Sequence, residues 1–329
     1  MNSSQQRPGL LFTLVGPAGA GKNRLMKYVL ERTDVRQLPT ATTRPIRSGE
    51  VQGREHDFVP LTEFQHMVET GELLEHQVIH GNLYGMPRKA VEHAIKSGQS
   101  IIADIEYLGA ARARAIYPNN AVSVFIQTPS IGTLIERMYD RNEATAEIAK
   151  RLLRVPKELD YARECNYRIL NDSFQHAADL LYRIVESEIN GERGTVESDA
   201  LVVYRYRYEA QIIPVYHGEL LRRTEPPFEP AEPIKTGEMP HVAGLRYLHD
   251  QLGLAVNASA LIAGDKPDGD YLPPLRLRYG HDNQGELVTY VYLYCLNQRI
   301  EPPPGWSWLS ISGAELPETF ADALAEYQP

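Results

Sequence analysis

Residues 16–22 read Gly-Pro-Ala-Gly-Ala-Gly-Lys, a spacing of glycines and lysine that is typical of a phosphate-binding loop. The glycines at positions 16, 19 and 21 allow backbone N–H groups to turn inward around phosphate oxygens. The start of a following helix adds positive potential, and Lys22 can reach the terminal phosphates. Gly16, Gly19, Gly21 and Lys22 therefore predict a binding site for the phosphate groups of a ligand.

Two further residues near this loop are candidates for holding Mg²⁺. The position after the lysine normally carries Ser or Thr, and here it is Asn23, whose amide oxygen can coordinate a hard cation directly or through water. Asp104 ends an apolar run, where an ionised carboxylate is costly unless it serves a ligand or a metal-bound water. We expect Asn23 and Asp104 to bind the metal, the latter indirectly.

The elements that must position these residues alternate along the first part of the chain. Short apolar runs at 10–15, 100–106 and 122–127 predict buried parallel strands. Segments whose apolar residues recur at helical spacing lie between and after these runs. This alternation predicts an α/β fold with a parallel sheet and helices on both faces. The expected helices lie at 23–32, 61–70, 87–97, 130–140, 144–163 and 173–189.

The pattern changes near residue 190. Residues 191–199 are polar, contain glycine and have no apolar period, so they predict a linker between domains at 8–190 and 200–329. Tyrosines alternate with other residues at 204–208 and at 290–294, which is the period of a strand. With one clear helix near 240–252, the second domain is predicted to be α+β.

Composition excludes several classes of protein. The 329-residue chain has no apolar run of 18 residues and no signal-peptide pattern at its start, and its two cysteines lie far apart, which together favour a cytoplasmic protein without membrane contact. Residues 1–190 carry 23 basic and 23 acidic residues, whereas residues 191–329 carry 11 and 20. We therefore expect no nucleic-acid surface, because phosphate-backbone binding needs clustered cations.

Residues 10–190 resemble guanylate kinase, the enzyme family that transfers phosphate from ATP to GMP. The resemblance implies a P-loop nucleoside monophosphate kinase fold, nucleotide substrates, and ATP and Mg²⁺ as cofactors. It is carried, in the family's order, by Thr42-Thr-Arg-Pro-Ile-Arg47, Gly49-Glu50, Gly53, Phe58, Leu74-Glu75, Gly81-Asn-Leu-Tyr84-Gly85, Asp104-Ile-Glu106, Arg137, Arg141, Arg151-Leu152 and Asn171-Asp172.

The resemblance also assigns roles to individual residues. Arg44 and Arg47 would clamp the acceptor phosphate with the hydroxyl of Tyr84, and Glu75 would accept from guanine N1–H and the 2-amino group. Lys22, Asp104 and three arginines that close over the triphosphate would carry phosphoryl transfer. Those arginines are Arg137, Arg141 and Arg151.

Several acceptor-site residues depart from the family's usual types. Thr40 replaces a serine, His56 a tyrosine, Glu106 an aspartate, and Met86 a Ser or Thr of the base pocket. GMP or dGMP is the expected acceptor. Two alternatives stay open: a kinase with another acceptor, such as a modified purine nucleotide or a phosphorylated sugar, and a nucleotide-binding or interaction module without turnover. The chain could also form a homo-oligomer.

Residues 200–329 resemble a degenerate Nudix domain. Five positions of the Nudix box match and Asp250 is a conservative replacement, whereas Glu232, Tyr247 and Gln251 occupy the remaining positions. With two acids of the box lost, the resemblance implies a domain that binds or supports rather than one that hydrolyses diphosphates. The matching residues are Glu238, Arg246, Leu248, Gly253 and Leu254, followed downstream by Trp308-Leu309 and Gly313-Ala-Glu-Leu316.

Overall fold

The computed structural model describes residues 7–47, 49–79, 81–217, 219–225, 231–262 and 271–310. The chain divides into two compact units. Unit 1 contains Met1–Leu134 and Arg154–Val203, and unit 2 contains Ile135–Leu153 and Tyr204–Pro329. The sequence predicted a single boundary at 191–199, whereas the structure also assigns the internal segment Ile135–Leu153 to the second unit.

Unit 1 is built on a five-stranded sheet in which every neighbouring pair is parallel. All residues of β1 and β8 are buried, which explains why these strands read as continuous apolar runs rather than as alternating ones. This confirms the predicted parallel sheet. Its order is β2 (Arg36–Gln37), β7 (Ile101–Asp104), β1 (Leu11–Val15), β8 (Ala121–Gln127) and β9 (Tyr167–Leu170).

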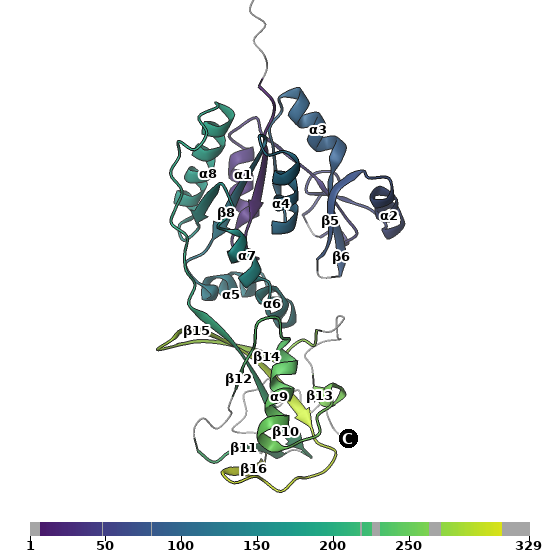
Figure 1. Cartoon of the computed structure of the whole chain (residues 1–329), viewed down its shortest axis with the longest axis vertical. Coiled ribbons are helices and arrows are strands. Elements are labelled where there is room, and N and C mark those ends of the chain that lie inside the picture. The colour runs from purple at the N-terminus through teal and green to yellow at the C-terminus, as the bar shows by residue number, and fades with distance from the viewer. Residues whose placement is uncertain are drawn as a thin grey trace, which may run out of the picture. The chain divides into compact units, whose positions relative to one another are not determined.

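Helices cover both faces of this sheet, as Figure 1 shows for α1 and α8 on one side and α4 on the other. On one face, Leu11 packs in a cluster with residues of α3 and α4, and Val15 in a cluster with residues of α4 and α7. Phe12 and Leu14 alternate with them and are buried on the other face. The helices are α1 (Lys22–Leu30), α3 (Arg88–Ser97), α4 (Tyr107–Ile116), α7 (Val155–Tyr161) and α8 (Phe174–Ile189).

A second, four-stranded sheet in unit 1 carries most of the expected acceptor residues. Its strands run in the order β4 (His56–Phe58), β3 (Thr40–Thr42), β6 (Asn82–Pro87) and β5 (Leu73–Ile79). Helix α2 (Leu61–Glu69) packs beside it through Phe64, which is fully buried against Ala41 and Leu73. The small sheet therefore has its own core and holds its side chains in place.

Unit 2 combines a mixed sheet with helices that pack on it, which agrees with the α+β prediction. Its central strands β10 (Tyr206–Tyr216) and β15 (Gly285–Cys295) pair in parallel, and α9 (Pro240–Leu252) packs on β10. Gly244 permits this packing, because a Cβ there would lie 2.4 Å from the Ile212 side chain. The other strands are β11 (Glu219–Arg223), β12 (Glu232–Pro233), β13 (Leu261–Ile262), β14 (Arg276–Asp282) and β16 (Trp306–Ser310).

The segment between the two units differs from its prediction in one respect. A single helix was expected over 144–163, but α6 (Thr145–Leu152) ends and α7 begins at Val155. Pro156 lies in the first turn of α7, where its missing N–H costs nothing, and it could not continue α6 without breaking a hydrogen bond. Helix α5 (Ile131–Tyr139) precedes α6 and spans the boundary between the units.

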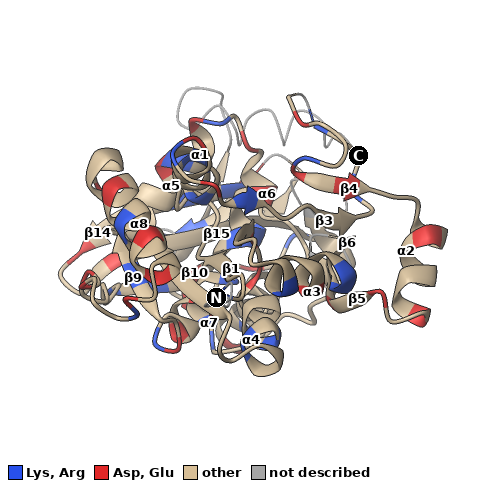
Figure 2. Cartoon of the chain, turned by 90° about the horizontal axis from the view of Figure 1, so that it is seen from above, with Lys and Arg blue, Asp and Glu red and all other residues tan. Residues whose placement is uncertain are grey.

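The charged residues of both signs are interspersed on the helices, as Figure 2 shows along α8. That helix contains Asp179, Arg183, Glu186 and Glu188 within its sixteen residues. Among the residues that the structure describes, no helix has the length and apolar character needed to cross a bilayer.

Candidate functional site

The phosphate-binding loop connects β1 to α1 and has the backbone that its glycines predict. Gly16, Gly19 and Gly21 have φ of 143°, 85° and 96°, values that L side chains rarely adopt. A Cβ at Gly16 would lie 2.2 Å from the carbonyl oxygen of Ile126. From the other side, the Asn171 amide donates to the carbonyl of Ala20 at 2.7 Å and holds the loop against β9.

Lys22 and Asp104 lie together at the carboxyl ends of β1 and β7. The Lys22 ammonium donates to the carbonyl oxygens of Gly16 at 2.6 Å and Pro17 at 3.2 Å, and lies 3.7 Å from an Asp104 carboxylate oxygen. The lysine thus folds back over its own loop, next to the carboxylate that the sequence pairs with it. Both groups are placed where a triphosphate held by the loop would meet them.

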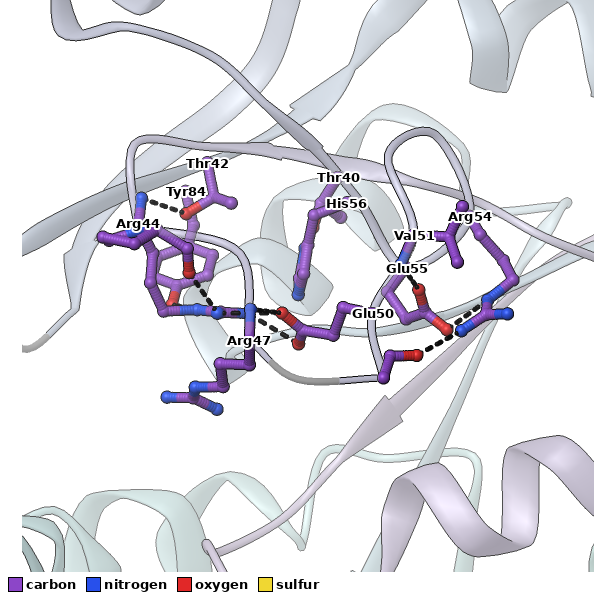
Figure 3. Close-up of polar contacts among 12 residues, drawn as sticks. Thr40, Thr42, Arg44, Arg47, Glu50, Val51, Arg54, Glu55, His56 and Tyr84 are labelled. Carbon is purple, nitrogen blue, oxygen red and sulfur yellow. Dashed lines mark hydrogen bonds and ion pairs between the residues drawn. The ribbon is translucent and has the colours of Figure 1, made fainter.

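The acceptor-phosphate end of the site is organised around Arg44, which is almost fully buried (Figure 3). Its two terminal nitrogens donate to the two carboxylate oxygens of Glu50 at 3.0 and 2.8 Å, and Nε donates to the Tyr84 hydroxyl at 3.0 Å. Glu50 also accepts from the backbone N–H of Arg47 at 2.8 Å. The Glu50 carboxylate therefore orients the Arg44 side chain beside Tyr84 and binds the backbone of Arg47, whose own side chain is exposed.

The titration of this cluster follows from its contacts. Burial raises the pKa of Glu50, but the hydrogen bonds from Arg44 and the Arg47 backbone outweigh it, so the pKa lies below its usual value. Burial and the charge of Arg44 lower the pKa of His56. His56 is hydrogen-bonded through Nδ1 to the Thr40 hydroxyl at 2.7 Å, so these two residues stand side by side on β3 and β4. His56 is therefore favoured as a neutral hydrogen-bonding group.

The expected base-recognition end lies on β5. Glu75 is half-buried, and burial raises the pKa of its carboxyl group, partly offset by a hydrogen bond from Gln77 at 3.0 Å. Gly109, in the first turn of α4, allows this arrangement, because a Cβ there would lie 3.0 Å from the Glu75 carboxylate. Glu106, at the start of α4, adds a second negative charge that raises the Glu75 pKa further.

Met86 lies in the hydrophobic core rather than among these polar groups. Its side chain is fully buried in a cluster with Leu74, Val91 and Ala103. Met86 thus contributes packing beneath the sheet, whereas Gln77 supplies a polar group on the same strand face as Glu75.

Gln77 gives a prediction about pH. Gln77→Leu removes the hydrogen bond that stabilises the ionised Glu75, so the Glu75 pKa should rise further above its usual value. The ionised carboxylate is the expected acceptor for the base, so the fall of kcat/KM for GMP on the acid side should begin at a higher pH in the variant. A pH profile from 5 to 8 checks this, with Val78→Ala, at an exposed and uncharged position of the same strand, as control. Superimposable profiles would show that Gln77 does not act on Glu75.

A buried carboxylate, Glu158 on α7, lies behind the phosphate end of the site. Burial and the nearby charge of Glu106 raise the pKa of Glu158 to about 7, although Lys22 and Arg154 lower it. Arg154 pairs with Glu106 at 2.6 Å. Three carboxyl groups, those of Asp104, Glu106 and Glu158, therefore lie near only two cationic side chains, Lys22 and Arg154.

The raised pKa of Glu158 predicts a pH-dependent stability. Between the ordinary pKa near 4.5 and about 7, the folded chain binds more protons at this group than the unfolded chain, so its contribution to the unfolding free energy falls as pH rises. The unfolding free energy of Glu158→Gln, relative to that of wild type, should rise by about 1 kcal/mol per pH unit as pH increases across this window. Urea unfolding at pH 5, 6 and 7 measures the difference. The exposed Glu164→Gln is the control, and a flat difference for Glu158→Gln contradicts the prediction.

The three arginines expected to close over the triphosphate belong to unit 2, whereas the other expected site residues belong to unit 1. Arg151, on α6, pairs with Glu143 at 3.1 Å, and Arg141 lies 4.0 Å from the same carboxylate. Arg137 is in the last turn of α5. In this arrangement Glu143 holds two of the three arginines.

The residues that resemble a Nudix box form a structural ion pair network. Arg246 donates to both carboxylate oxygens of Glu238 at 3.1 Å and also pairs with Glu232. Asp250 and Gln251 are exposed at the end of α9. No cluster of three or more metal-ligating side chains occurs within the described ranges, and residues 313–316 of the Nudix resemblance lie outside them.

Asn23 and Asp104 are the candidate ligands for Mg²⁺. Asn23 is exposed in the first turn of α1, and the Asp104 carboxylate is about one-third exposed next to Lys22. Both offer hard oxygen ligands, and Mg²⁺ at nucleotide sites takes few protein ligands and completes its shell with phosphates and water. The two residues fit such an ion.

Sequence reasoning did not assign roles to Glu50, Gln77, Glu143, Arg154 or Glu158. Each of the first four acts by pairing with a residue that was expected in the site. Gln77 could have been found from the period of two that puts it on the face of Glu75. The partners of Glu143 and Arg154 depend on how helices pack and leave no local signal.

Comparisons with known proteins identify the family of residues 9–188. The family model described as Guanylate kinase matches residues 9–188. The chain is 39% identical over 190 residues to a guanylate kinase of Bradyrhizobium diazoefficiens, covering 57% of this chain and 85% of that one. It is 40% identical over 175 residues to a guanylate kinase of Nostoc, covering 53% and 87%.

Two solved structures are similar to parts of the chain. The crystal structure of guanylate kinase from Anaplasma phagocytophilum has a TM-score of 0.46 at 28% identity, over 55% of this chain and 86% of that chain. A Nudix-family hydrolase from Clostridium perfringens has a TM-score of 0.26 at 14% identity, over 33% and 83%. The Nudix assignment of unit 2 stays a prediction. Because the family model matches more than half of the chain, this protein belongs to the guanylate kinase family and is a nucleoside monophosphate kinase.

Proposed function

We propose that the protein phosphorylates GMP or dGMP with ATP as donor. The observation that carries this proposal is the pair of groups at the four-stranded sheet of unit 1. The buried Arg44, which follows β3 and contacts Tyr84 and Glu50, suits a phosphate, and the half-buried carboxylate of Glu75 on β5 suits a base. A nucleoside monophosphate carries the two matching groups, a phosphate at one end and a base at the other.

The acceptor's phosphate would be bound by Arg44, Arg47 and Tyr84. Arg44 is already oriented by Glu50, so little side-chain entropy is lost when the phosphate binds. His56 would offer a hydrogen bond to the same phosphate. The acceptor's base would be read by Glu75, with Glu106 nearby and Thr40 contributing a hydrogen bond. Adenine has no pair of donors that matches the Glu75 carboxylate, so this residue would favour guanine.

The donor's phosphates would lie in the loop of residues 16–22, with Lys22 moving from its own loop carbonyls to the phosphate oxygens. Arg137, Arg141 and Arg151 would neutralise the charge that spreads over the transferred group, and Arg151 must exchange Glu143 for phosphate. Asn23 and Asp104 would hold Mg²⁺, the latter through water. When bound, Mg²⁺ supplies positive charge to the terminal phosphate oxygens.

The C-terminal domain is proposed to be non-catalytic. Arg246, Glu232 and Glu238 are engaged with one another, and the remaining acid of the helix, Asp250, is exposed. Diphosphate hydrolysis of the Nudix type needs several carboxylates around one metal, and this helix offers one.

The test is ADP formation from ATP and Mg²⁺ with GMP, dGMP, IMP, AMP, CMP and UMP as acceptors. Turnover limited to GMP and dGMP, and lost in Arg44→Met, supports the proposal. Turnover with a different acceptor overturns the guanine assignment but keeps the kinase. If no acceptor in the panel supports ADP formation while ATP still binds, the assignment of these acceptors is overturned altogether.

A further inference from the structure

Helix α6, which carries Arg151, is part of the core of unit 2. Its residues Ala146, Ile148, Ala149 and Leu152 are buried, and the helix packs beside β14 of the mixed sheet. In Figure 1, α6 and β14 lie next to each other. The segment that holds the triphosphate-facing arginines therefore belongs to the same compact unit as the C-terminal sheet.

Two tyrosines of the sheet bind the end of this helix. The last four carbonyl groups of a helix have no partner within the helix, and in α6 these belong to residues 149–152. The hydroxyl of Tyr290 on β15 donates to the Ala149 carbonyl at 3.1 Å, and the hydroxyl of Tyr208 on β10 donates to the Leu152 carbonyl at 2.5 Å. The sheet thus binds the helix through carbonyl groups on both sides of Arg151 in the sequence, those of Ala149 and Leu152.

The two tyrosines also support each other. Their rings lie 5.9 Å apart at an interplanar angle of 88°, the edge-to-face arrangement that aromatic rings prefer. Tyr290 is fully buried, so its hydroxyl and the Ala149 carbonyl would each lose a buried hydrogen bond if α6 separated from the sheet. The contact therefore opposes independent movement of the helix.

We propose that Tyr208 and Tyr290 are positioning residues for Arg151, so that the C-terminal sheet and the arginine-bearing segment move as one body when the arginines close on ATP. This inference rests on the proposed function, because it concerns the rate of phosphoryl transfer. It gives the C-terminal domain a role in catalysis without a chemistry of its own.

The double variant Tyr208→Phe/Tyr290→Phe tests the proposal while keeping both rings. We expect kcat with GMP to fall about tenfold, a loss on the scale of two buried hydrogen bonds. The KM for GMP should stay within twofold, because the GMP residues lie in unit 1. Hydrogen exchange of the α6 amides should become faster, and the Kd for ATP measured without acceptor should rise about threefold to tenfold.

Tyr292→Phe is the matched control. Tyr292 lies two residues from Tyr290 on β15, is fully buried, and donates to the Leu272 carbonyl at 3.0 Å rather than to α6. Tyr292→Phe removes one comparable hydrogen bond of the same strand, so it shows how far the loss of such a bond, without any contact to α6, changes the measured quantities. The proposal requires kcat, ATP affinity and α6 exchange to stay near wild type in this control.

Two results overturn the proposal: an unchanged or increased kcat in the double variant, or equal changes in the Tyr292→Phe control. If the wild-type protein phosphorylates no acceptor in the panel, the proposed function fails separately. The exchange rates of α6 and the ATP affinity then still decide whether the tyrosines position the helix.

Discussion

Lys22→Met should lower kcat about 10³-fold, or about 4 kcal/mol of transition-state stabilisation. The lysine is mostly buried, lies over the phosphate loop and faces Asp104, and phosphoryl transfer depends on positioned positive charge rather than on covalent help from the protein. Methionine keeps the length of the side chain and removes only the charge. Steady-state rates with saturating ATP and GMP measure the effect.

Lys27→Met is the control for this substitution. Lys27 lies on the same helix with its side chain 77% exposed and pairs with Glu31 at the surface. Its loss should change kcat by less than about twofold, since exposed ion pairs contribute little. Equal effects of the two substitutions would show that charge at the loop is not what drives the reaction.

Glu75→Gln should lower kcat/KM for GMP about 10³-fold with a much smaller effect on ATP. In the proposed complex the half-buried carboxylate would accept from two donors of guanine, whereas the amide of glutamine would present a donor to one of them and leave it unpaired. The preference for GMP over AMP, expressed as the ratio of their kcat/KM values, should consequently weaken in the variant. The measurement is kcat/KM for each nucleotide, and Glu63→Gln, at an exposed position of α2, is the control. A retained preference for GMP in Glu75→Gln would assign base recognition to other residues.

The raised pKa of Glu75 adds a pH dependence to the same prediction. The ionised form is the proposed acceptor for the base, and burial raises the pKa above its usual value, so kcat/KM for GMP should fall as pH is lowered through that raised pKa. The acid limb should disappear in Glu75→Gln, whose low activity no longer depends on a carboxylate. An unchanged acid limb in the variant would mean that another group titrates.

The amino-acid sequence by itself determined the phosphate loop, the parallel sheet and the alternation of strands and helices along the first part of the chain. These depend on local features: glycines at fixed spacing, buried strands that are apolar throughout, and helical periods between them. Resemblance then placed Arg44, Tyr84 and Glu75, and the structure brings Arg44 and Tyr84 into contact.

Only the tertiary structure decided which groups hold these residues. The pairing of Glu50 with Arg44 requires the loop after β3 to fold back on itself. Met86 lies in the core next to the point where the register between β5 and β6 shifts. The capping of α6 by Tyr208 and Tyr290 joins segments that are far apart in sequence. A sequence shows the period of each strand or helix but not its partners, because those contacts form between distant segments whose packing free energy depends on the whole fold.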